Sequence, residues 1–415
     1  MTDLARFAAT HGIRHFLFSF CDLFGVQRAK LVPAAAAAEL ARSGAGFAGF
    51  AAWLAMTPAD PDVLAIPDPT SLMVLPWQKD VAWVATDLQV EGQVLEQSPR
   101  RVLQRQIARA AALGLQFRSG VEAEFFLMDP ERDAIADGLD RQSKPCYDQL
   151  ALMRHYPLIS ELLDGMESLG WGPYQADHED ANGQFELNWT YAESLLTADR
   201  HAFFRVMAAA LAERHGVRVS FQPKPIPALT GNGAHLHASL WDEGGRNVFH
   251  DPAGEKGLSE IAYRFLAGLL AHAPALCALT NPVAGSYRRL ARSITSSGAT
   301  WSPSWISYGG NNRTHMVRIP DDQRIELRLG DGAANPYLLQ AAVLAAGLDG
   351  IERRLDPGPR SDLNTYVEAP AGAASLPTCH ADALEAFRHD APLRDSLGEA
   401  FCSAYEALVA QRGDV

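Results

Sequence analysis

The sequence lacks the features that mark extracellular, membrane and nucleic-acid-binding proteins. Acidic residues outnumber basic ones by 49 to 36, and the formal charge of −13 repels phosphate backbones, so we expect no nucleic-acid partner. The start of the chain has no positive region followed by a long apolar run, and no apolar run reaches membrane-spanning length. We therefore expect neither a signal peptide nor a membrane partner.

Cysteine is also scarce, and its spacing argues against a disulfide framework. The chain has five cysteines, an odd number with no paired spacing: Cys21, Cys146, Cys277, Cys379 and Cys402. Scattered cysteines are typical of reduced thiols in a cytosol-like compartment. We therefore expect a cytoplasmic protein.

Size and composition predict a globular protein with two domains. A chain of 415 residues with 47% apolar and 20% charged residues is too long for one ordinary core and too apolar to be disordered. Strand-like runs around an Ala-rich helix predict a small N-terminal α+β domain over residues 1–97. Ser98 and Pro99 then suit the N-cap and first turn of a helix that begins a larger domain, residues 98–415.

The second domain mixes strand-like runs that carry polar residues with amphipathic runs of helical length. The predicted strands are residues 115–128, 183–189, 217–223, 234–241, 314–319 and 324–330. The predicted helices are residues 146–169, 197–215, 257–276, 336–355 and 380–411. This pattern predicts a sheet with one chemically active face and one face buried by helices.

One apolar run, residues 120–129, contains two glutamates that strand geometry places on the same face, Glu122 and Glu124. Desolvating two like charges side by side is costly unless a cation lies between them. Four further residues repeat this oddity in other strand-like runs: Glu179, Glu186, His235 and Glu326. Five carboxylates and one imidazole are typical ligands of Mg²⁺ or Mn²⁺, and six ligands indicate two ions because Mg²⁺ usually keeps several waters.

Each of these residues also has an ordinary structural explanation. A single Glu on a strand usually belongs to a solvated face. His235 alone fits a hydrogen-bonded core histidine, and Glu326 alone fits an ion pair with Arg324 or Arg328. The metal hypothesis depends on the number of such residues in runs that are too apolar for surface strands.

Arginines cluster in the same part of the chain. They are Arg288, Arg289, Arg313, Arg318, Arg324 and Arg328. The guanidinium fork suits carboxylates and phosphates, so metals and arginines on adjoining strands predict a clamp for phosphoryl transfer. Because the chain has neither a Walker loop nor a G-x-G-x-x-G after a strand, the usual phosphate cradles are absent. Surface ion pairs remain the alternative for one or two of these arginines.

Six segments in order resemble motifs of the glutamine synthetase family. They are "VEAEFF", "HEDANGQFEL", "TGNGAHLHASLW", "NPVAGSYRRL", "NNRTHMVRIP" and "RIELRLGDGAANPYLLQAAVLAAGLDGI". The resemblance runs over nearly the whole chain. It implies an α+β fold with a small N-terminal β-grasp-like domain and a larger catalytic domain, whose curved, mostly antiparallel sheet is flanked by helices.

The resemblance also implies a role for individual residues. One metal is held near glutamate by Glu124, Glu179 and Glu186, and the other near the ATP phosphates by Glu122, His235 and Glu326. Arg289, Arg328 and the backbone of Gly231 bind glutamate. The remaining residues face ATP: its phosphates contact Arg313, Arg318 and Arg324, and the nucleotide lies near His237 and Ser239.

The activity implied is ATP-dependent ligation of an amine to L-glutamate through γ-glutamyl phosphate, with two or more Mg²⁺ or Mn²⁺ ions. Phosphorylation is needed because a free carboxylate has no adequate leaving group for an amine to displace. Family members form double rings, so we expect a homo-oligomer, a dodecamer, whose active sites are shared between neighbouring subunits.

The chain departs from the ammonia-using members at the amine pocket. Ala48 stands where they have an Asp, Thr295 aligns with their flap Glu, and Thr230 replaces an Asn. Two carboxylates that attract ammonium are therefore missing, and nearby apolar residues can line a roomier pocket: Phe47, Phe50 and Trp53. This pattern resembles the branch with type III-like glutamine synthetases and γ-glutamylmethylamide synthetase, and it predicts a glutamate–methylamine ligase.

Ammonia remains the alternative amine, because another carboxylate such as Asp60 or Asp62, or one from a neighbouring subunit, can replace those that are missing. A two-metal phosphoester hydrolase is a rival reading, but the carboxylate-binding arginines argue against it. A catalytically silent ring protein would have lost a metal ligand, and all six are present. Tyr366, where some family members carry a modifiable tyrosine, is expected to be a structural tyrosine.

Overall fold

The N-terminal part of the chain forms a seven-stranded mixed sheet. The computed structural model describes residues 3–291 and 295–412. The sheet has the order β2-β1-β6-β4-β3, with β5 and β7 also paired to β6. Its strands are β1 (His15–Cys21), β2 (Gln27–Pro33), β3 (Ala45–Phe47), β4 (Val63–Pro67), β5 (Met73–Leu75), β6 (Gln78–Val90) and β7 (Gln93–Val94). Its helices are α1 (Asp3–His11), α2 (Ala34–Ser43) and the short 3-10 turns η1 (Gly49–Ala52) and η2 (Pro69–Ser71).

The larger second sheet has nine strands in the order β14-β15-β16-β13-β8-β10-β9, with β11 and β12 also paired to β8. Its strands are β8 (Leu115–Met128), β9 (Pro173–His178), β10 (Gln184–Trp189), β11 (Ala192–Glu193), β12 (Arg218–Ser220), β13 (Ala234–Asp242), β14 (Tyr308–Gly309), β15 (Val317–Arg318) and β16 (Ile325–Leu327). All pairings are antiparallel except β14 with β15. The predicted α+β fold with a mostly antiparallel sheet in the larger part is confirmed, and the structure shows that both sheets are mixed.

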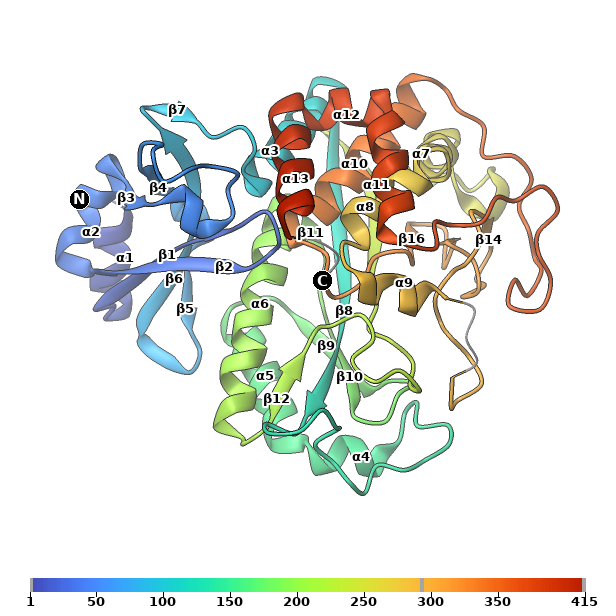
Figure 1. The fold of residues 1–415 in the computed structure, drawn as a ribbon, viewed down its shortest axis with the longest axis horizontal. Coiled ribbons are helices and arrows are strands. Elements are labelled where there is room, and N and C mark those ends of the chain that lie inside the picture. Colours follow the sequence, from blue (N-terminus) through green and yellow to red (C-terminus); the bar gives the residue numbers. More distant parts are fainter. Residues whose placement is uncertain (1–2, 292–294, 413–415) are drawn as a thin grey trace.

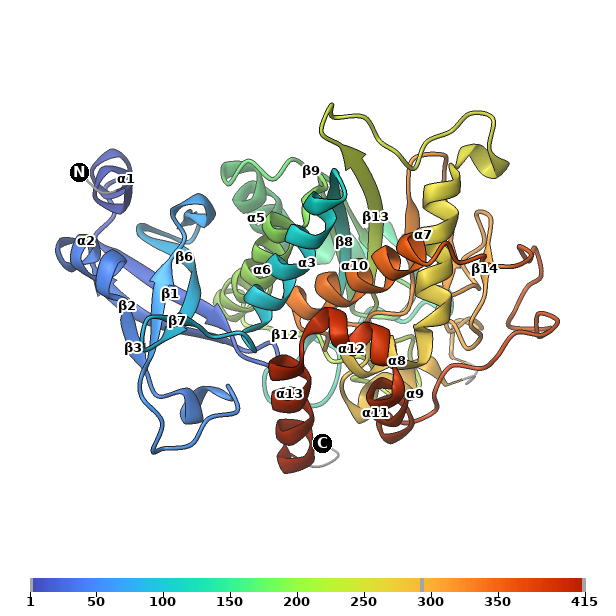
Figure 2. The same cartoon turned by 90° about the horizontal axis from the view of Figure 1, so that it is seen from above.

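Helices bury one face of the second sheet and leave the other face for the charged residues. Alternate residues of β8, such as Phe125, are fully buried in the main core, and the Phe125 ring lies 6.0 Å from that of Phe204. The covering helices are α3 (Pro99–Ala112), α6 (Ser194–Arg214) and α10 (Pro336–Glu352), which contact one another and lie beside β8 (Figure 2). Because strand side chains alternate, burying Phe125 turns Glu122 and Glu124 to the opposite face.

Three helices predicted to be continuous are broken. Residues 146–169 form α4 (Gln149–Arg154) and α5 (Tyr156–Ser168), and residues 257–276 contain η3 (Glu255–Gly257), α7 (Glu260–Ala271) and the start of α8 (Ala273–Thr280). Residues 380–411 form α11 (His380–His389), α12 (Ala391–Leu397) and α13 (Glu399–Arg412). A proline lies in the first turn of α5, α8 and α12, where its missing N–H breaks no helical bond but ends the preceding helix.

A buried arginine joins the two parts of the chain. Arg100 of α3 forms ion pairs of 2.7 Å with Asp68 and Asp87 of the N-terminal part and of 3.1 Å with Asp199 of α6. The three carboxylates compensate the charge of the buried Arg100 guanidinium. Loss of any one of them would leave that charge less well compensated.

Within the described residues, no single helix has both the length and the apolarity to cross a membrane. Helices α7 and α8 have the required length and apolarity only when they are taken together, and the chain bends by 76° between them.

Candidate active site

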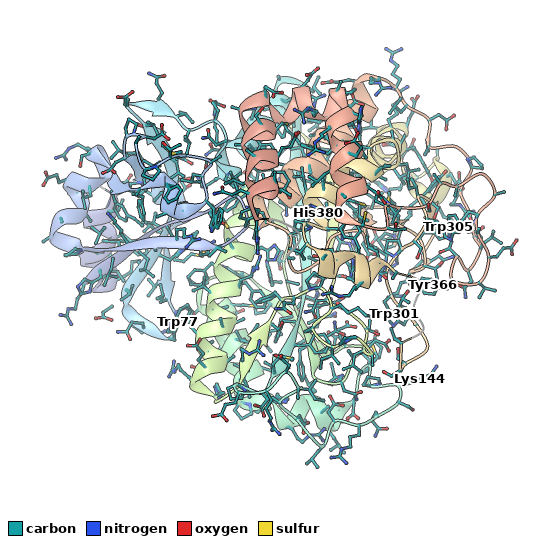
Figure 3. The ribbon with its side chains drawn as sticks, viewed as in Figure 1. Trp77, Lys144, Trp301, Trp305, Tyr366 and His380 are labelled. Atoms are coloured by element: carbon teal, nitrogen blue, oxygen red, sulfur yellow. The ribbon has the colours of Figure 1, made fainter. Side chains whose placement is uncertain are left out.

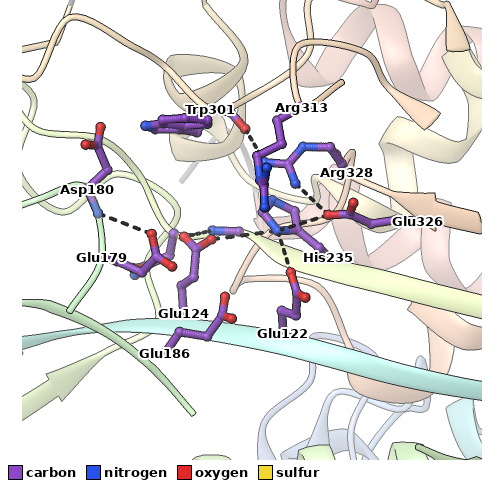
Figure 4. A network of polar contacts seen from close by, with 12 residues as sticks. Glu122, Glu124, Glu179, Asp180, Glu186, His235, Trp301, Arg313, Glu326 and Arg328 are labelled. Carbon is purple, nitrogen blue, oxygen red and sulfur yellow. Dashed lines mark hydrogen bonds and ion pairs between the residues drawn. The ribbon is translucent and has the colours of Figure 1, made fainter. Parts of the chain in front are cut away.

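The register of the second sheet aligns acidic residues across neighbouring strands. Glu186 of β10 lies opposite Glu124 of β8, and Asp177 of β9 lies opposite Glu186 on the other side. On β13, His235 lies opposite Glu122 of β8. Directly opposed residues in an antiparallel pair have Cβ atoms about 5 Å apart, so the register alone brings these side chains together. Figure 4 shows the cluster they form.

The first metal group predicted from the sequence is assembled on this face. Three residues offer carboxylate oxygens within 4.8 Å of one another: Glu124, Glu179 and Glu186. Their hydrogen-bond donors are neutral, namely the side chains of Gln184 and Asn188 and the backbone nitrogens of Gly233 and Asp180. Burial, reinforced by neighbouring carboxylates, raises the pKa of Glu179 and Glu186 well above the usual value. Three carboxylates with only neutral donors fit a divalent cation.

The second predicted group also comes together, but arginines compensate part of its charge. His235 Nδ1 lies 3.3 Å from Glu122 Oε2 and 3.8 Å from Glu326 Oε1. Glu326 is fully buried and pairs with Arg328 Nη1 at 2.5 Å and Arg318 Nη1 at 2.7 Å. Burial opposes ionisation of Glu326, but the charge of Arg328 outweighs it and lowers the pKa to about 2. Glu326 is therefore an ionised carboxylate that two guanidinium groups hold in place.

A second imidazole lies within ligand distance of the same group. His237 Nε2 donates to Glu122 Oε1 at 2.8 Å, because His237 Nδ1 accepts from Arg324 Nε at 3.0 Å. Ligand atoms of His237, Glu122 and Glu326 lie within 4.8 Å of one another. Burial favours the neutral form of Glu122, but the hydrogen bonds from His235 and His237 hold its pKa well below the usual value. Two imidazoles therefore keep Glu122 charged.

Arg289 is fixed by backbone carbonyls at the edge of the carboxylate cluster. The short helix α9 (Ala284–Leu290), which the sequence did not predict, carries Arg289 in its last turn. The buried guanidinium donates to Leu329 O at 3.0 Å and to Arg328 O at 3.3 Å. Because carbonyls fix the fork without neutralising it, its charge remains available to an anionic ligand.

Gly231 lies against Arg289 and has no room for a side chain. A Cβ at Gly231 would lie 2.2 Å from Pro223 O and 3.1 Å from Arg289 Cγ. The Gly231 carbonyl accepts from Gln184 Nε2 at 3.1 Å. The backbone here can therefore approach Arg289 and any ligand it binds only because the residue is glycine.

Arg328 connects the metal groups to a loop over the site. Its Nη1 binds Glu326, its Nη2 donates to Trp301 O at 3.2 Å, and its buried Nε has no partner among the described residues. A buried donor without a partner is costly, so the Nε position suits a ligand oxygen.

A cavity of about 460 Å³ opens beside the second metal group. Its lining includes Glu122, His237, Ser239, Arg324 and Trp241. The Trp241 ring lies 4.2 Å from the Arg118 guanidinium carbon and stacks on Tyr191 at 6.4 Å. The second metal group therefore lines one part of the cavity, and the Trp241 and Tyr191 rings with the Arg118 guanidinium line another.

The chain matches the model of the glutamine synthetase catalytic domain over residues 96–411. The chain belongs to the glutamine synthetase family. It is 53% identical over 409 residues to a glutamine synthetase of Rhizobium leguminosarum bv. phaseoli, covering 98% of this chain and 94% of that protein. It is 42% identical over 408 residues to a glutamate–methylamine ligase of Methyloversatilis universalis, covering 96% of this chain and 92% of that protein. Its structure matches a GmaS/ADP complex with 57% identity and a TM-score of 0.96, covering 99% of this chain and 96% of that chain.

The other arginines expected from the family motifs lie around the same cluster. Arg318 Nη1 pairs with Glu326, while its Nε and Nη2 donate to Asn311. Arg324 bridges His237 and Asp321. Arg313 is exposed, and Figure 4 draws it beside Arg328. Ser239 is buried and accepts from Trp241 Nε1 at 3.0 Å.

Two residues predicted for the amine pocket lie in different parts of the chain. Ala48 is exposed and lies between β3 and η1, next to the N-terminal sheet. The strands of that sheet do not pair with those of the second sheet. Thr295 is buried and its hydroxyl donates to Ala299 O, in a loop that also contacts Asp180. Within one subunit the structure therefore places only Thr295 next to the cluster.

Tyr366 contacts this loop through a side-chain hydrogen bond with Thr300, and Figure 3 labels it near Trp301. It is partly buried, its hydroxyl donates to Arg313 O at 3.5 Å, and burial raises its pKa above the usual value.

Several residues near the metal groups were missed in the sequence. Asp177, on the strand before Glu179, has its pKa raised to about 6 by burial and by Glu122 and Glu124. Asp140 comes from the loop before α4 and accepts hydrogen bonds from His178 and its neighbours. The two-residue spacing of Asp177, on β9, and Glu179, just after it, was a usable signal, whereas nothing in the local sequence marks Asp140.

Proposed function

We propose that the protein ligates an amine to the γ-carboxylate of L-glutamate at the expense of ATP, through γ-glutamyl phosphate, and that the amine is methylamine. The observation that carries the ligase part is the arrangement of two metal groups beside two buried arginines on one sheet face. Metal-bound phosphates and arginine-bound carboxylates are the two partners that this chemistry must bring together.

Glutamate binds on the side of the first metal group. Arg289 is held by two backbone carbonyls and by His235 Nε2, and Arg328 Nε lacks a partner among the described residues. These two arginines bind the α-carboxylate of glutamate and orient its γ-carboxylate. Gly231 lets the backbone approach the substrate amino acid. Two bidentate guanidinium forks give this substrate a defined direction.

ATP binds in the cavity of about 460 Å³, with its base against the wall of Trp241 and Tyr191 and near Ser239. The phosphates extend toward His237, and Arg313, Arg318 and Arg324 contact them. When bound, the Mg²⁺ or Mn²⁺ ions supply charge neutralisation at the γ-phosphate. Glu122, Glu124, Glu179, Glu186, His235 and Glu326 would hold those ions.

The residues order two displacement steps. A γ-carboxylate oxygen attacks the γ-phosphorus, the bond from that phosphorus to the β–γ bridging oxygen breaks, and ADP leaves with the electron pair. The amine nitrogen then attacks the acyl carbon, the C–O bond to phosphate breaks, and inorganic phosphate leaves. An amine that binds as an ammonium ion loses one proton before the attack and a second one as phosphate leaves, and the product is the γ-amide. Closing the site against water protects the mixed anhydride between the two steps.

Methylamine is proposed because the acidic groups expected for ammonium are replaced by Ala48 and Thr295. The similarity to a glutamate–methylamine ligase and to a GmaS/ADP complex supports it. The glutamine synthetase of Rhizobium leguminosarum bv. phaseoli, at 53% identity, supports ammonia as the second candidate. A methyl group that leaves water for an apolar pocket contributes about 0.8 kcal/mol, enough for a severalfold preference.

The test is phosphate release from ATP with glutamate and each of methylamine, ethylamine and ammonia. We expect the highest kcat/KM with methylamine, and a higher kcat/KM with ammonia would contradict the proposed amine. Activity without glutamate or amine would favour a phosphoester hydrolase, and nucleotide binding without turnover would favour a silent homologue. The substitution Ala48→Asp is expected to improve the use of ammonia.

We further propose a double-ring homo-oligomer, a dodecamer, in which Ala48 of one subunit reaches the site of a neighbour. The exposed position of Ala48 in the N-terminal sheet supports a contribution in trans. A cytoplasmic location is proposed because all five cysteines are free thiols.

A further inference from the structure

A loop of residues 295–301 lies over the first metal group and is tied to Asp180. The Ser297 hydroxyl donates to Asp180 Oδ2, and the Thr230 hydroxyl donates to the same oxygen at 3.1 Å. Thr230 also lies 3.5 Å from Ala299 O, within the loop. Asp180 is therefore a buried carboxylate that two neutral hydroxyls hold at the junction of the loop and the metal group.

These contacts involve only one of the two carboxylate oxygens of Asp180. Both hydroxyls bind Oδ2, and Oδ1 has no hydrogen-bond partner among the described residues. The Asp180 backbone nitrogen donates to Glu179 Oε2 at 3.2 Å, so Asp180 follows directly on a metal-group residue. A carboxylate oxygen that lacks a protein donor, on a residue that is otherwise mostly buried, suits a cationic hydrogen-bond donor.

The loop also presents an aromatic ring that the mechanism described above does not use. Trp301 has a φ of 54°, in the left-handed region that a bulky residue rarely adopts, and Arg328 Nη2 holds its carbonyl at 3.2 Å. Its indole Nε1 is buried without a partner among the described residues. In Figure 4 the indole of Trp301 and the carboxylate of Asp180 point toward one another. Backbone strain of this kind persists at sites where a side chain must be held for function.

We propose that Asp180 and Trp301 form the specificity site for the alkylammonium form of the amine. Asp180 Oδ1 accepts a hydrogen bond from the N–H of the cation, and the Trp301 ring packs on its methyl group and positive charge. Tryptophan is the best aromatic partner for alkylated ammonium groups, which bind over its face. This inference rests on the proposed ligase function. In it, Asp180 and Trp301 take the role of the two acidic residues that are missing at Ala48 and Thr295.

The first experiment compares the amines in Trp301→Leu and Trp301→Phe enzymes. Trp301→Leu is expected to raise KM for both amines, because both bind as cations, and to lower the ratio of kcat/KM for methylamine over ammonia by about threefold, because the methyl group loses part of its apolar contact. Trp301→Phe keeps an aromatic face and is expected to retain most of the ratio even if the leucine variant folds poorly. Trp305→Leu is the matched control, since Trp305 pairs with Ser375 through a backbone bridge, and it should leave the ratio unchanged.

The second experiment tests the carboxylate. Asp180→Asn is expected to raise KM for both amines by about tenfold or more, with a smaller change in KM for glutamate and ATP. Asp180→Glu should recover part of the loss. Equal losses for all three substrates would overturn the role of Asp180, because they would indicate a structural effect on the metal group.

The outcomes separate the two proposals. If the unmodified enzyme prefers ammonia, the methylamine proposal fails, while Asp180→Asn still reports whether Asp180 binds the ammonium ion. If the enzyme prefers methylamine and Trp301→Leu keeps the full preference, the aromatic specificity site fails and the ligase function stands.

Discussion

Glu186 and Glu124 face each other across the antiparallel pair β10 and β8, both buried and on one sheet face. Like charges directly opposed in a sheet are destabilising, and burial adds a desolvation cost. The donors around the two residues are neutral, and the raised pKa of Glu186 shows that the pair cannot hold both charges without a cation. Stability and activity should therefore both depend on metal.

Glu186→Gln should remove metal-dependent stabilisation. We expect Mn²⁺ to raise the Tm of the unmodified enzyme through binding to the folded state only. The variant should show a much smaller shift and at least about a 100-fold loss of phosphate release, because a ligand is lost. The matched control is Glu39→Gln, an exposed glutamate on α2 that should behave like the unmodified enzyme. An unchanged Mn²⁺ shift in Glu186→Gln would argue against this residue as a ligand.

Gly231→Ala should weaken glutamate binding through a steric clash. The new Cβ would lie 2.2 Å from Pro223 O and press on Arg289, so the backbone or the guanidinium must move. We expect a stability loss of about 1–3 kcal/mol and a higher KM for glutamate, measured by urea unfolding and by phosphate release. Gly138→Ala is the control, because nothing lies within 4 Å of a Cβ there. A normal glutamate KM in Gly231→Ala would contradict the placement of glutamate against Arg289.

Asp140→Asn should weaken metal binding at the first metal group, although Asp140 is not one of its three carboxylates. Asp140 Oδ2 accepts from His178 Nε2 at 2.7 Å and from the Gly183 backbone nitrogen at 2.6 Å, and His178 Nδ1 binds Glu179 O at 2.9 Å. Asp140 is therefore a positioning residue for the turn that carries Glu179. We expect the Mn²⁺ concentration for half-maximal activity to rise about 10- to 100-fold, the range for such supporting residues.

The readout for Asp140 is the split between metal and substrate constants. KM for ATP at saturating Mn²⁺ should stay close to that of the unmodified enzyme. Asp137→Asn, in the same loop but paired with Arg154, should leave the Mn²⁺ dependence unchanged. A general loss of stability with no change in Mn²⁺ dependence would reduce Asp140 to a structural role.

His272 should make stability depend on pH far from the active site. Its ring nitrogens lie 2.6 Å from Asp390 and 2.9 Å from Asp349, and Arg353 also pairs with Asp349. Burial lowers the pKa of His272, but the hydrogen bonds that its ring N–H groups donate to the two carboxylates outweigh it and raise the pKa above 6.5. A raised folded-state pKa gives stability that is complete below about pH 6.5 and is lost as pH rises through the folded-state value.

Urea unfolding at several pH values tests this expectation. The free energy of unfolding should fall between about pH 6 and pH 9 in the unmodified enzyme and fall less in His272→Gln. Metal-free samples of both proteins should be compared, so that metal binding does not contribute. An identical pH dependence in the two proteins would show that His272 does not titrate between the two carboxylates.

The strands that carry the site follow from local pattern. Residues 115–128 form β8 as predicted. Apolar residues alternate with Glu122 and Glu124, so the strand buries its apolar face and turns the two glutamates to the other face. The helix breaks were missed, because Pro157, Pro274 and Pro392 are each compatible with the first turn of a new helix. Apolar periodicity continues across such a break, so it predicts one helix where the chain has two.

The sequence by itself determined which residues carry charge in apolar surroundings and which strand faces they share, because strand alternation is a local property. Only the tertiary structure decided their partners. It set the register that opposes Glu186 to Glu124, the approach of Asp140 to His178 and the orientation of the Trp301 indole toward Asp180. These contacts join segments that are far apart in the chain, and they depend on sheet pairing and loop packing that no short stretch of sequence encodes.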